Sequence, residues 1–285
     1  MTPLVTIDAL TVAFPLGRRL LGAPPMLKAV NNVSLDIPKG SFVGLVGESG
    51  SGKTTLGRAI LKAAPITEGR VIYDDGADRF DVATMPAHRE RDFRRHAQLI
   101  FQDPYAALSP RMTVRDIIAE PIEVLGLSSG REETDARVRE IAAKCRINLE
   151  HLRRYPHAFS GGQRQRISIA RTLAAGPRFV VADECVAALD VSIQADILNL
   201  LKQLQNDLDL TFLFISHDLS VIAHTCDFVA VMYLGEIVEK GPTRQIFANP
   251  QHDYTKALLS AIPSLDPDNR SRIAAFERGQ LKVEG

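Results

Sequence analysis

Long apolar runs are absent from this sequence of 285 residues. No uninterrupted stretch approaches the roughly 18 residues that a helix needs to cross a bilayer. The opening segment MTPLVTIDAL also lacks the positively charged and apolar regions of a secretory signal peptide. We therefore expect a chain that is made and kept in the cytosol and that does not itself span a membrane.

A surplus of charge of either sign is absent as well. Lysine plus arginine number 34, aspartate plus glutamate also number 34, and the formal net charge is zero. Domains that bind nucleic acid through its phosphates usually carry a clearly basic surface. The totals indicate no such surface, so nucleic acid is not expected as a partner.

Cysteine is scarce, and the three cysteines stand apart from one another. Cys145, Cys185 and Cys226 form no C-x-x-C pair, which favours reduced, buried thiols over disulfides or a zinc site. Cys185 directly follows Asp183 and Glu184, and their negative charge disfavours a thiolate. We therefore predict that Cys185 is a small packing residue rather than a redox or nucleophilic group.

Glycine, by contrast, is concentrated in one short segment, GLVGESGSGKTTLGRAI at residues 44–60. The apolar residues 42–46 predict a buried strand, and Leu56, Ile60 and Leu61 recur at helical spacing. The glycines therefore form a turn between a strand and a helix. A surface turn without a ligand is the alternative, but it leaves the match to a known phosphate-binding pattern unexplained.

The order G-x-x-x-x-G-K-T within this segment predicts a site for a nucleoside triphosphate. Backbone amides and the positive end of the helix surround the phosphates, which bulky side chains would keep away. Lys53 is placed to reach the terminal phosphates, and the hydroxyl of Thr54 to ligate Mg²⁺. The predicted ATP contacts in the loop are Gly47, Ser49, Gly50, Ser51, Gly52, Lys53, Thr54 and Thr55.

Two adjacent carboxylates follow a second apolar run, at residues 179–182. Ligands bind at the carboxyl ends of strands in open α/β sheets, so Asp183 is predicted to hold Mg²⁺ and Glu184 to orient or deprotonate the attacking water. His217, after the apolar run 211–215, is placed to contact the γ-phosphate. Taken alone, two adjacent acids after an apolar run are more typical of a strand that leaves the core for solvent. A lone histidine at a strand end is usually just a polar cap. The phosphate loop favours the catalytic roles.

The segment FSGGQ at residues 159–163 offers a second helix start suited to an anion. One nucleotide does not need two such sites within one chain. A head-to-tail dimer explains both, because the segment of one subunit can close over the γ-phosphate held by Lys53 of the other. An ordinary serine N-cap followed by a glycine turn is the alternative. The predicted contacts across the dimer from this segment are Ser160, Gly161, Gly162 and Gln163.

The rest of the chain divides by its hydrophobic pattern. Residues 4–14, 27–46 and 70–73 predict strands of a small sheet around the phosphate loop. Residues 103–177 predict a helical lobe. Beyond it, apolar runs alternate with the helix expected at 191–207, which indicates a mostly parallel α/β sheet.

The motifs GESGSGKT, IFQDP, FSGGQRQR, VVADE, ALD and ISHD, in this order, resemble those of ATP-binding subunits of ABC transporters. The resemblance covers nearly the whole chain. It implies an α/β P-loop NTPase of the ABC type, with a mostly parallel core sheet, a small N-terminal antiparallel β-subdomain and an inserted helical lobe. The implied ATPase domain spans 1–240, with the lobe at about 103–177, and a C-terminal extension spans 241–285.

The resemblance also implies roles for three further residues. Gln102 corresponds to the glutamine between core and lobe, a catalytic and metal-contacting position, and Asp190 to the loop that contacts ATP across the dimer. Phe14 corresponds to the aromatic residue that stacks on adenine, although a phenylalanine that ends an N-terminal strand is most often part of the core.

Within that family, IFQDPYAALSPRMTV, ALDVSIQADILNLL, VMYLGEIVEKGP and NPQHDYTKALLSAIP are similar to the oligopeptide, dipeptide and nickel importer branch. This similarity implies an ATPase, using ATP and Mg²⁺, that drives import of a solute. Peptides are the first expectation, with nickel and oligosaccharides left open. The implied partners are two transmembrane permeases, a second ABC ATPase subunit that is identical or homologous, and indirectly a periplasmic or extracellular solute-binding protein. The implied location is peripheral, at the cytoplasmic face of a bacterial inner membrane.

Three positions depart from the branch pattern, which usually has proline at Cys185, serine at Ala187 and proline at Asp253. None of them removes a predicted ligand of phosphate, metal or water. The tail lacks the cysteine cluster of some relatives, so no iron–sulfur centre is expected. A soluble ABC-type enzyme of DNA repair or translation is the alternative function, but a long coiled-coil insertion or a second ATPase module is not evident. A regulatory module with an inactive site would be expected to lack Lys53 or Glu184.

Overall fold

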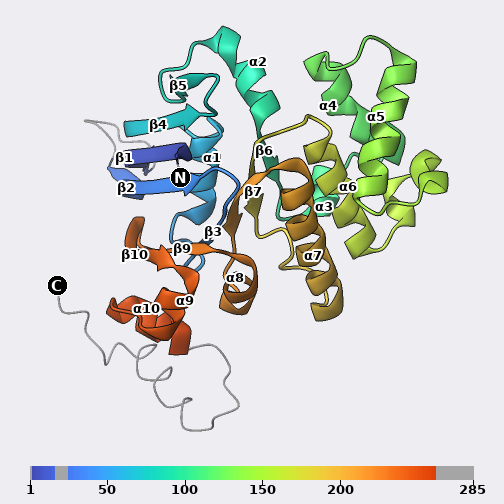
Figure 1. Ribbon diagram of the computed structural model, residues 1–285. Helices are drawn as coiled ribbons and strands as arrows, with labels where there is room; N and C mark the ends of the chain where they lie inside the picture. The colour runs from blue at the N-terminus through green and yellow to red at the C-terminus, as the bar shows by residue number, and fades with distance from the viewer. Residues whose placement is uncertain (1, 17–24, 261–285) are drawn as a thin grey trace.

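The computed structural model of the chain describes residues 2–16 and 25–260, and the structural statements below concern these residues (Figure 1). Residues 17–24 lie outside them, as does the part of the predicted C-terminal extension from 261 onward.

The smaller of two sheets is antiparallel and has the strand order β2-β1-β4-β5. Val33, Leu35 and Ile37 of β2 are buried and alternate with exposed residues, because only one face of this sheet packs on the protein interior. Its strands are β1 (Pro3–Pro15), β2 (Met26–Pro38), β4 (Glu68–Asp74) and β5 (Arg79–Asp81). The predicted antiparallel N-terminal sheet is confirmed.

The larger sheet has the order β10-β9-β3-β8-β7-β6, and all neighbours are parallel except β10 and β9. Its strands are β3 (Phe42–Val46), β6 (Ala97–Ile100), β7 (Phe179–Asp183), β8 (Thr211–Ile215), β9 (Phe228–Tyr233) and β10 (Glu236–Pro242). The grouping of residues 42–46 with the small sheet was wrong. All five residues of β3 are buried, which is typical of a parallel strand covered on both faces.

Successive residues of the central strands face two different hydrophobic cores. Val43 and Leu45 pack with residues of the small sheet, together with Leu56 and Ile60 of α1 (Lys53–Ile60). The intervening positions face a second core formed with the helices on the other side. The central helices on that side are α7 (Val191–Leu208) and α8 (Leu219–Thr225), and α7 confirms the helix predicted at 191–207. The core sheet therefore lies between two apolar layers, and its carboxyl edge is left for polar residues.

The helical lobe stands to one side of the sheets (Figure 1). It contains α3 (Pro104–Ala107), α4 (Val114–Leu125), α5 (Arg131–Lys144), η1 (Leu149–Arg153), η2 (Pro156–Ala158) and α6 (Gly161–Leu173). Thr113 caps α4 by accepting a bond from the Asp116 amide, and Gly126 ends it in the left-handed conformation. These helices lie within residues 103–177, where the lobe was predicted. That these residues form one inserted unit stays a prediction.

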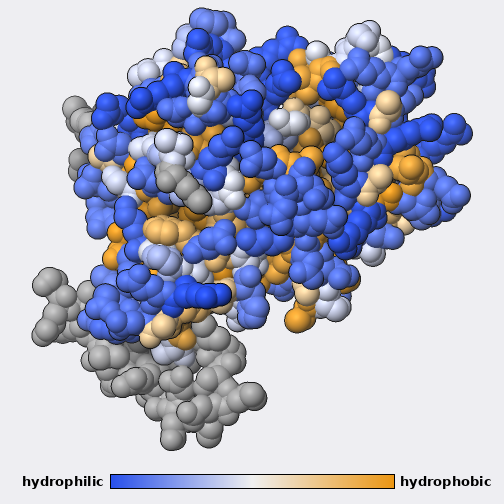
Figure 2. All heavy atoms as spheres, in the orientation of Figure 1, coloured by the Kyte–Doolittle hydropathy of each residue, from blue (hydrophilic) through white to orange (hydrophobic). Residues whose placement is uncertain are grey.

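The elements that were not predicted include α2 (Ala87–His96), β5, β6, α8 and β10. The segment after β10 forms α9 (Thr243–Ala248) and α10 (Asp253–Ser260), which both contact β10 and are drawn beneath it in Figure 1. Figure 2 shows a largely hydrophilic face on which hydrophobic residues appear mainly in small groups. Among the helices of 2–16 and 25–260, none is long and apolar enough to cross a membrane.

Candidate nucleotide-binding site

The register of the core sheet brings distant polar residues to one edge. Strands β6 and β7 pair in parallel, with Ile100 opposite Ala182. Gln102 and Glu184 each lie two residues beyond this pair, and Gln102 Nε2 donates a hydrogen bond of 2.9 Å to Glu184 Oε2. The predicted catalytic glutamine and glutamate are thus in direct contact, although 82 positions separate them in the sequence.

Thr54 and Asp183 form the second contact at this edge. Thr54 Oγ1 donates to Asp183 Oδ1 at 3.0 Å. Burial raises the pKa of Asp183, and the hydrogen bond from Thr54 opposes that rise by favouring the charged carboxylate. A hydroxyl and a carboxylate are the hard oxygen ligands that Mg²⁺ uses beside phosphate oxygens, so the residues present fit the predicted metal.

Lys53 is a buried cation, only 4% exposed. Its Nζ donates to the carbonyl oxygens of Gly47 at 2.7 Å and Glu48 at 2.6 Å. Burial lowers the pKa of Lys53, and the nearby carboxylates Glu184 and Asp183 counteract this. A buried ammonium group needs compensating negative charge, which the phosphates of a nucleotide would supply at this place.

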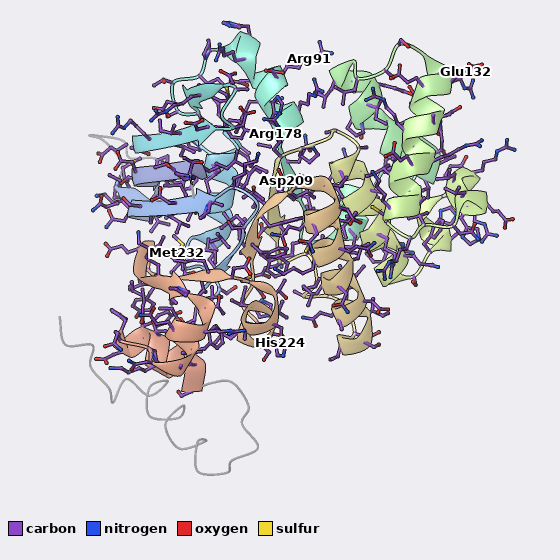
Figure 3. All side chains as sticks on the ribbon, in the orientation of Figure 1. Arg91, Glu132, Arg178, Asp209, His224 and Met232 are labelled. Carbon is purple, nitrogen blue, oxygen red and sulfur yellow. The ribbon has the colours of Figure 1, made fainter. Side chains whose placement is uncertain are left out.

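The glycines of the phosphate loop are also required by packing. A Cβ at Gly47 would lie 2.1 Å from the carbonyl oxygen of Met232, and one at Gly52 would lie 2.1 Å from that of Ala29. Both glycines have positive φ, 151° and 106°. Met232, labelled in Figure 3, belongs to strand β9, and its side chain is buried in the core. The loop is therefore held against β9 and β2 before any ligand binds.

Glu184 also faces His217, with 3.4 Å between Glu184 Oε1 and His217 Nδ1. The glutamate side chain is 16% exposed and that of the histidine 57%, so the histidine lies on the solvent side. Glu184 has a φ of 45°, which is costly for a residue with a Cβ. Its amide donates to the carbonyl of Ile215 at 3.0 Å, which holds the strained residue at the edge of β7.

The FSGGQ segment forms a capping box at the start of α6. The Ser160 hydroxyl accepts from the Gln163 amide, and the Gln163 side chain accepts from the Ser160 amide. Ser160 and Gln163 are exposed, whereas Gly162 is buried. A Cβ at Gly162 would lie 2.4 Å from Ile193 Cγ2 on α7, so helix packing by itself requires this glycine. The N-cap interpretation holds within the chain, and the contacts predicted across a dimer stay predictions.

Asp190 and Phe14 are exposed side chains on elements other than β7. Asp190 is exposed at the N-cap of α7, where its side chain makes no capping bond. Phe14 is 37% exposed on β1, opposite Leu27 of β2. Within the described part of the chain, neither side chain is bonded to Glu184 or Lys53, and their proposed contacts with ATP stay predictions.

The three cysteines are free and buried, as expected. The pKa of the Cys185 thiol is raised to about 12, mainly by burial and to a smaller extent by the charge of Asp183. Burial is thus the larger cause, and the neighbouring negative charge, which the sequence suggested, is the smaller one.

Replacing Cys185 with alanine is expected to keep ATPase turnover within a few-fold of wild type. The thiol is neutral and packed, so its removal should cost only about 1 kcal/mol of stability. Steady-state ATPase assays of both proteins, with and without alkylation, provide the measurement. A variant that folds and binds ATP normally but has lost turnover would contradict this role.

Two features around the loop were not predicted from the sequence. The Gly235 amide in the turn between β9 and β10 donates to the carbonyl of Ser51 at 3.0 Å. The Glu48 amide donates to the hydroxyl of Tyr254 on α10 at 3.0 Å. The tyrosine occurs in the segment NPQHDYTKALLSAIP, but no local pattern indicated that it contacts the loop.

Comparisons with known proteins agree with this geometry. Residues 30–187 match the family described as ABC transporter, and residues 238–282 match the family described as oligopeptide/dipeptide transporter, C-terminal region. A putative peptide import ATP-binding protein of Brucella ovis is 53% identical over 86% of this chain and 76% of its own length. The dipeptide transport ATP-binding protein DppF of Lactococcus lactis subsp. cremoris is 53% identical over 84% of this chain and 76% of its own. The oligopeptide transport ATP-binding protein OppF of Bacillus subtilis is 50% identical over 87% and 80%.

Solved structures show the same fold. A dimeric ATP-binding cassette in a post-hydrolysis state, bound to ADP and Pi, matches with a TM-score of 0.72 and 27% identity. The match covers 84% of this chain and 99% of that cassette. A component of an ABC transporter complex from Clostridium perfringens matches with a TM-score of 0.74 at 22% identity, which supports the fold alone.

Proposed function

Because this chain belongs to the ABC transporter family as an ATP-binding subunit of the oligopeptide and dipeptide type, we propose that it hydrolyses ATP to drive import of peptides through separate membrane permeases. One observation carries the assignment to an active ATPase rather than an inactive binding module. The contacts Gln102 to Glu184 and Thr54 to Asp183 lie at the same edge of the core sheet as the buried Lys53. The proposed peripheral site of action is the cytoplasmic face of the membrane.

The residues at this edge have different roles in the transfer of the γ-phosphoryl group to water. Lys53 exchanges its bonds to the loop carbonyls for the terminal phosphates of ATP, and the amides of residues 49–55 surround them. Glu184 accepts the proton of the attacking water. Gln102 and His217 contact the two carboxylate oxygens of the glutamate, and in the proposed mechanism they would face the γ-phosphate. Apart from the turn of Lys53 toward the phosphates, these side chains are already gathered at one edge of the sheet before the substrate binds.

Mg²⁺ is the proposed cofactor. When bound, it neutralises charge on the β- and γ-phosphates. The Thr54 hydroxyl and the Asp183 carboxylate are the proposed ligands, with Gln102 beside them. These side chains would keep their places on α1 and β7, so metal binding requires no rearrangement of the core.

The proposed assembly contains two such ATPase subunits. Ser160, Gly161 and Gln163 of one subunit, together with Asp190, would close over the nucleotide of the other. Ser160 and Gln163 are exposed and therefore free to meet a partner. Two permeases and an extracellular or periplasmic solute-binding protein would complete the transporter. The purification that tests the function also identifies the second ATPase subunit, as a copy of this chain or as a homologous chain.

Purification of the tagged chain from detergent-solubilised membranes is expected to recover two multi-spanning permease proteins. Peptide uptake by vesicles containing the recovered complex should require ATP and stop when Mg²⁺ is chelated, because the phosphates are then left unneutralised. Mass spectrometry of the purified material and uptake of labelled peptides provide the measurements. Recovery with ribosomes or DNA, and without permeases, would instead support the soluble mechanoenzyme.

A further inference from the structure

Helix α10 reaches the phosphate loop through one tyrosine. Tyr254 is 1% exposed, and its hydroxyl oxygen accepts a hydrogen bond of 3.0 Å from the backbone amide of Glu48. The two residues are 206 positions apart. Glu48 follows directly after Gly47, the first fixed glycine of the loop. An element beyond the core sheet therefore contacts the backbone of the phosphate loop itself.

The tyrosine is held firmly from its own side. Its ring lies against that of Tyr233 at the end of β9, with 4.1 Å between ring centroids. The carboxylate of Glu239 on β10 accepts bonds from the amides of Gln251 at 2.8 Å and His252 at 3.0 Å. These bonds fix the turn before α10 to the sheet. The hydroxyl of Tyr254 is thus a fixed acceptor rather than a mobile surface group.

The same stretch of loop backbone is also bonded to Lys53. The lysine Nζ contacts the carbonyl oxygens of Gly47 and Glu48 at 2.7 and 2.6 Å. According to the proposed function, Lys53 gives up these bonds when it turns to the phosphates of ATP. The bond from the Glu48 amide to Tyr254 involves no group that binds phosphate, so it is retained in that state.

We propose that Tyr254 is a positioning residue for the phosphate loop. Its hydroxyl keeps the backbone at residues 47–49 in place while Lys53 is engaged with ATP, so that the remaining loop amides stay aimed at the phosphates. Burial raises the pKa of Tyr254 to about 12, and the hydroxyl is therefore neutral at physiological pH. This inference rests on the proposed function of the site, and it gives helix α10 a part in nucleotide binding through the backbone of the phosphate loop.

Tyr254→Phe is the test, because it removes the hydroxyl and keeps the ring pair. We expect the Kd for ATP and the KM to rise about 3- to 10-fold, the change that corresponds to one ordinary hydrogen bond. The kcat at saturating ATP should change by less than about 2-fold, since Tyr254 touches no reacting group. Tyr233→Phe is the matched control: it removes a hydroxyl from the same ring pair but leaves the Glu48 bond intact, and should resemble wild type.

Amide hydrogen exchange of the full chain tests whether the bond itself forms in solution, whereas the separate effects on KM and kcat test its part in nucleotide binding. The Glu48 amide should exchange slowly in wild type and in Tyr233→Phe, and fast in Tyr254→Phe, with the core strands unchanged. Fast exchange of this amide in folded wild type would overturn the proposal, whatever the variants do. Equal ATP affinity of wild type and Tyr254→Phe would also overturn it. A wild-type chain that binds no ATP would contradict the proposed function itself, which separates the two failures.

Discussion

Replacing Glu184 with glutamine should lower ATP turnover by about 10²- to 10⁴-fold, the usual contribution of a positioned general base, while ATP still binds. The contacts of Glu184 explain why this change isolates the chemistry. A glutamine side chain retains an oxygen that can accept the bond from Gln102 Nε2, which is 2.9 Å from the carboxylate. What it loses is the ability to take a proton from water. The variant should therefore accumulate as an ATP-bound dimer.

Steady-state ATPase assays, nucleotide binding and size-exclusion chromatography with ATP provide the measurements for Glu184→Gln. Glu140→Gln is the control, because it neutralises an exposed glutamate that pairs with Lys144 at 2.7 Å on α5 in the helical lobe. That control should hydrolyse ATP like wild type. Near-normal turnover of Glu184→Gln would show that another group accepts the proton, and the assignment of Glu184 would be wrong.

Replacing Ser160 with arginine is expected to abolish hydrolysis and to leave nucleotide binding by the single chain intact. Ser160 is exposed at the N-cap of α6, so a long cationic side chain is tolerated by the isolated subunit. Loss of the cap should cost about 1 kcal/mol of stability, which is not enough to unfold the chain. In the proposed dimer, however, the arginine would enter the site where the partner holds the γ-phosphate.

Thr113→Arg is the matched control for the lost cap. Thr113 caps α4 in the same lobe, but it is outside the segment predicted to contact the partner. We expect its ATPase activity to stay within a few-fold of wild type. Mixing Ser160→Arg chains with Lys53→Ala chains should restore part of the activity, since each mixed dimer then contains one intact composite site. Full activity of Ser160→Arg alone would rule out the composite site.

The sequence by itself determined the parts of this protein that depend on local chemistry. Gly47, Gly52 and Lys53 stand at fixed spacing between a strand and a helix, and this arrangement needs only neighbouring residues to be recognised. The apolar runs within β7 and β8, at 179–182 and 212–215, could be identified for the same reason, because burial on both faces of a strand favours an unbroken run of apolar residues. Family and branch followed from the order of such motifs.

Tertiary structure decided what depends on strand register and on contacts between distant segments. The pairing of β6 with β7 sets Gln102 against Glu184, and β6 itself was not predicted from its four residues. Residues 42–46 joined the core sheet because both of their faces could be covered there, which a five-residue apolar run does not specify. Gly162 is required by the approach of Ile193 on another helix. Such contacts arise from the packing of whole elements, and no local spacing in the sequence encodes them.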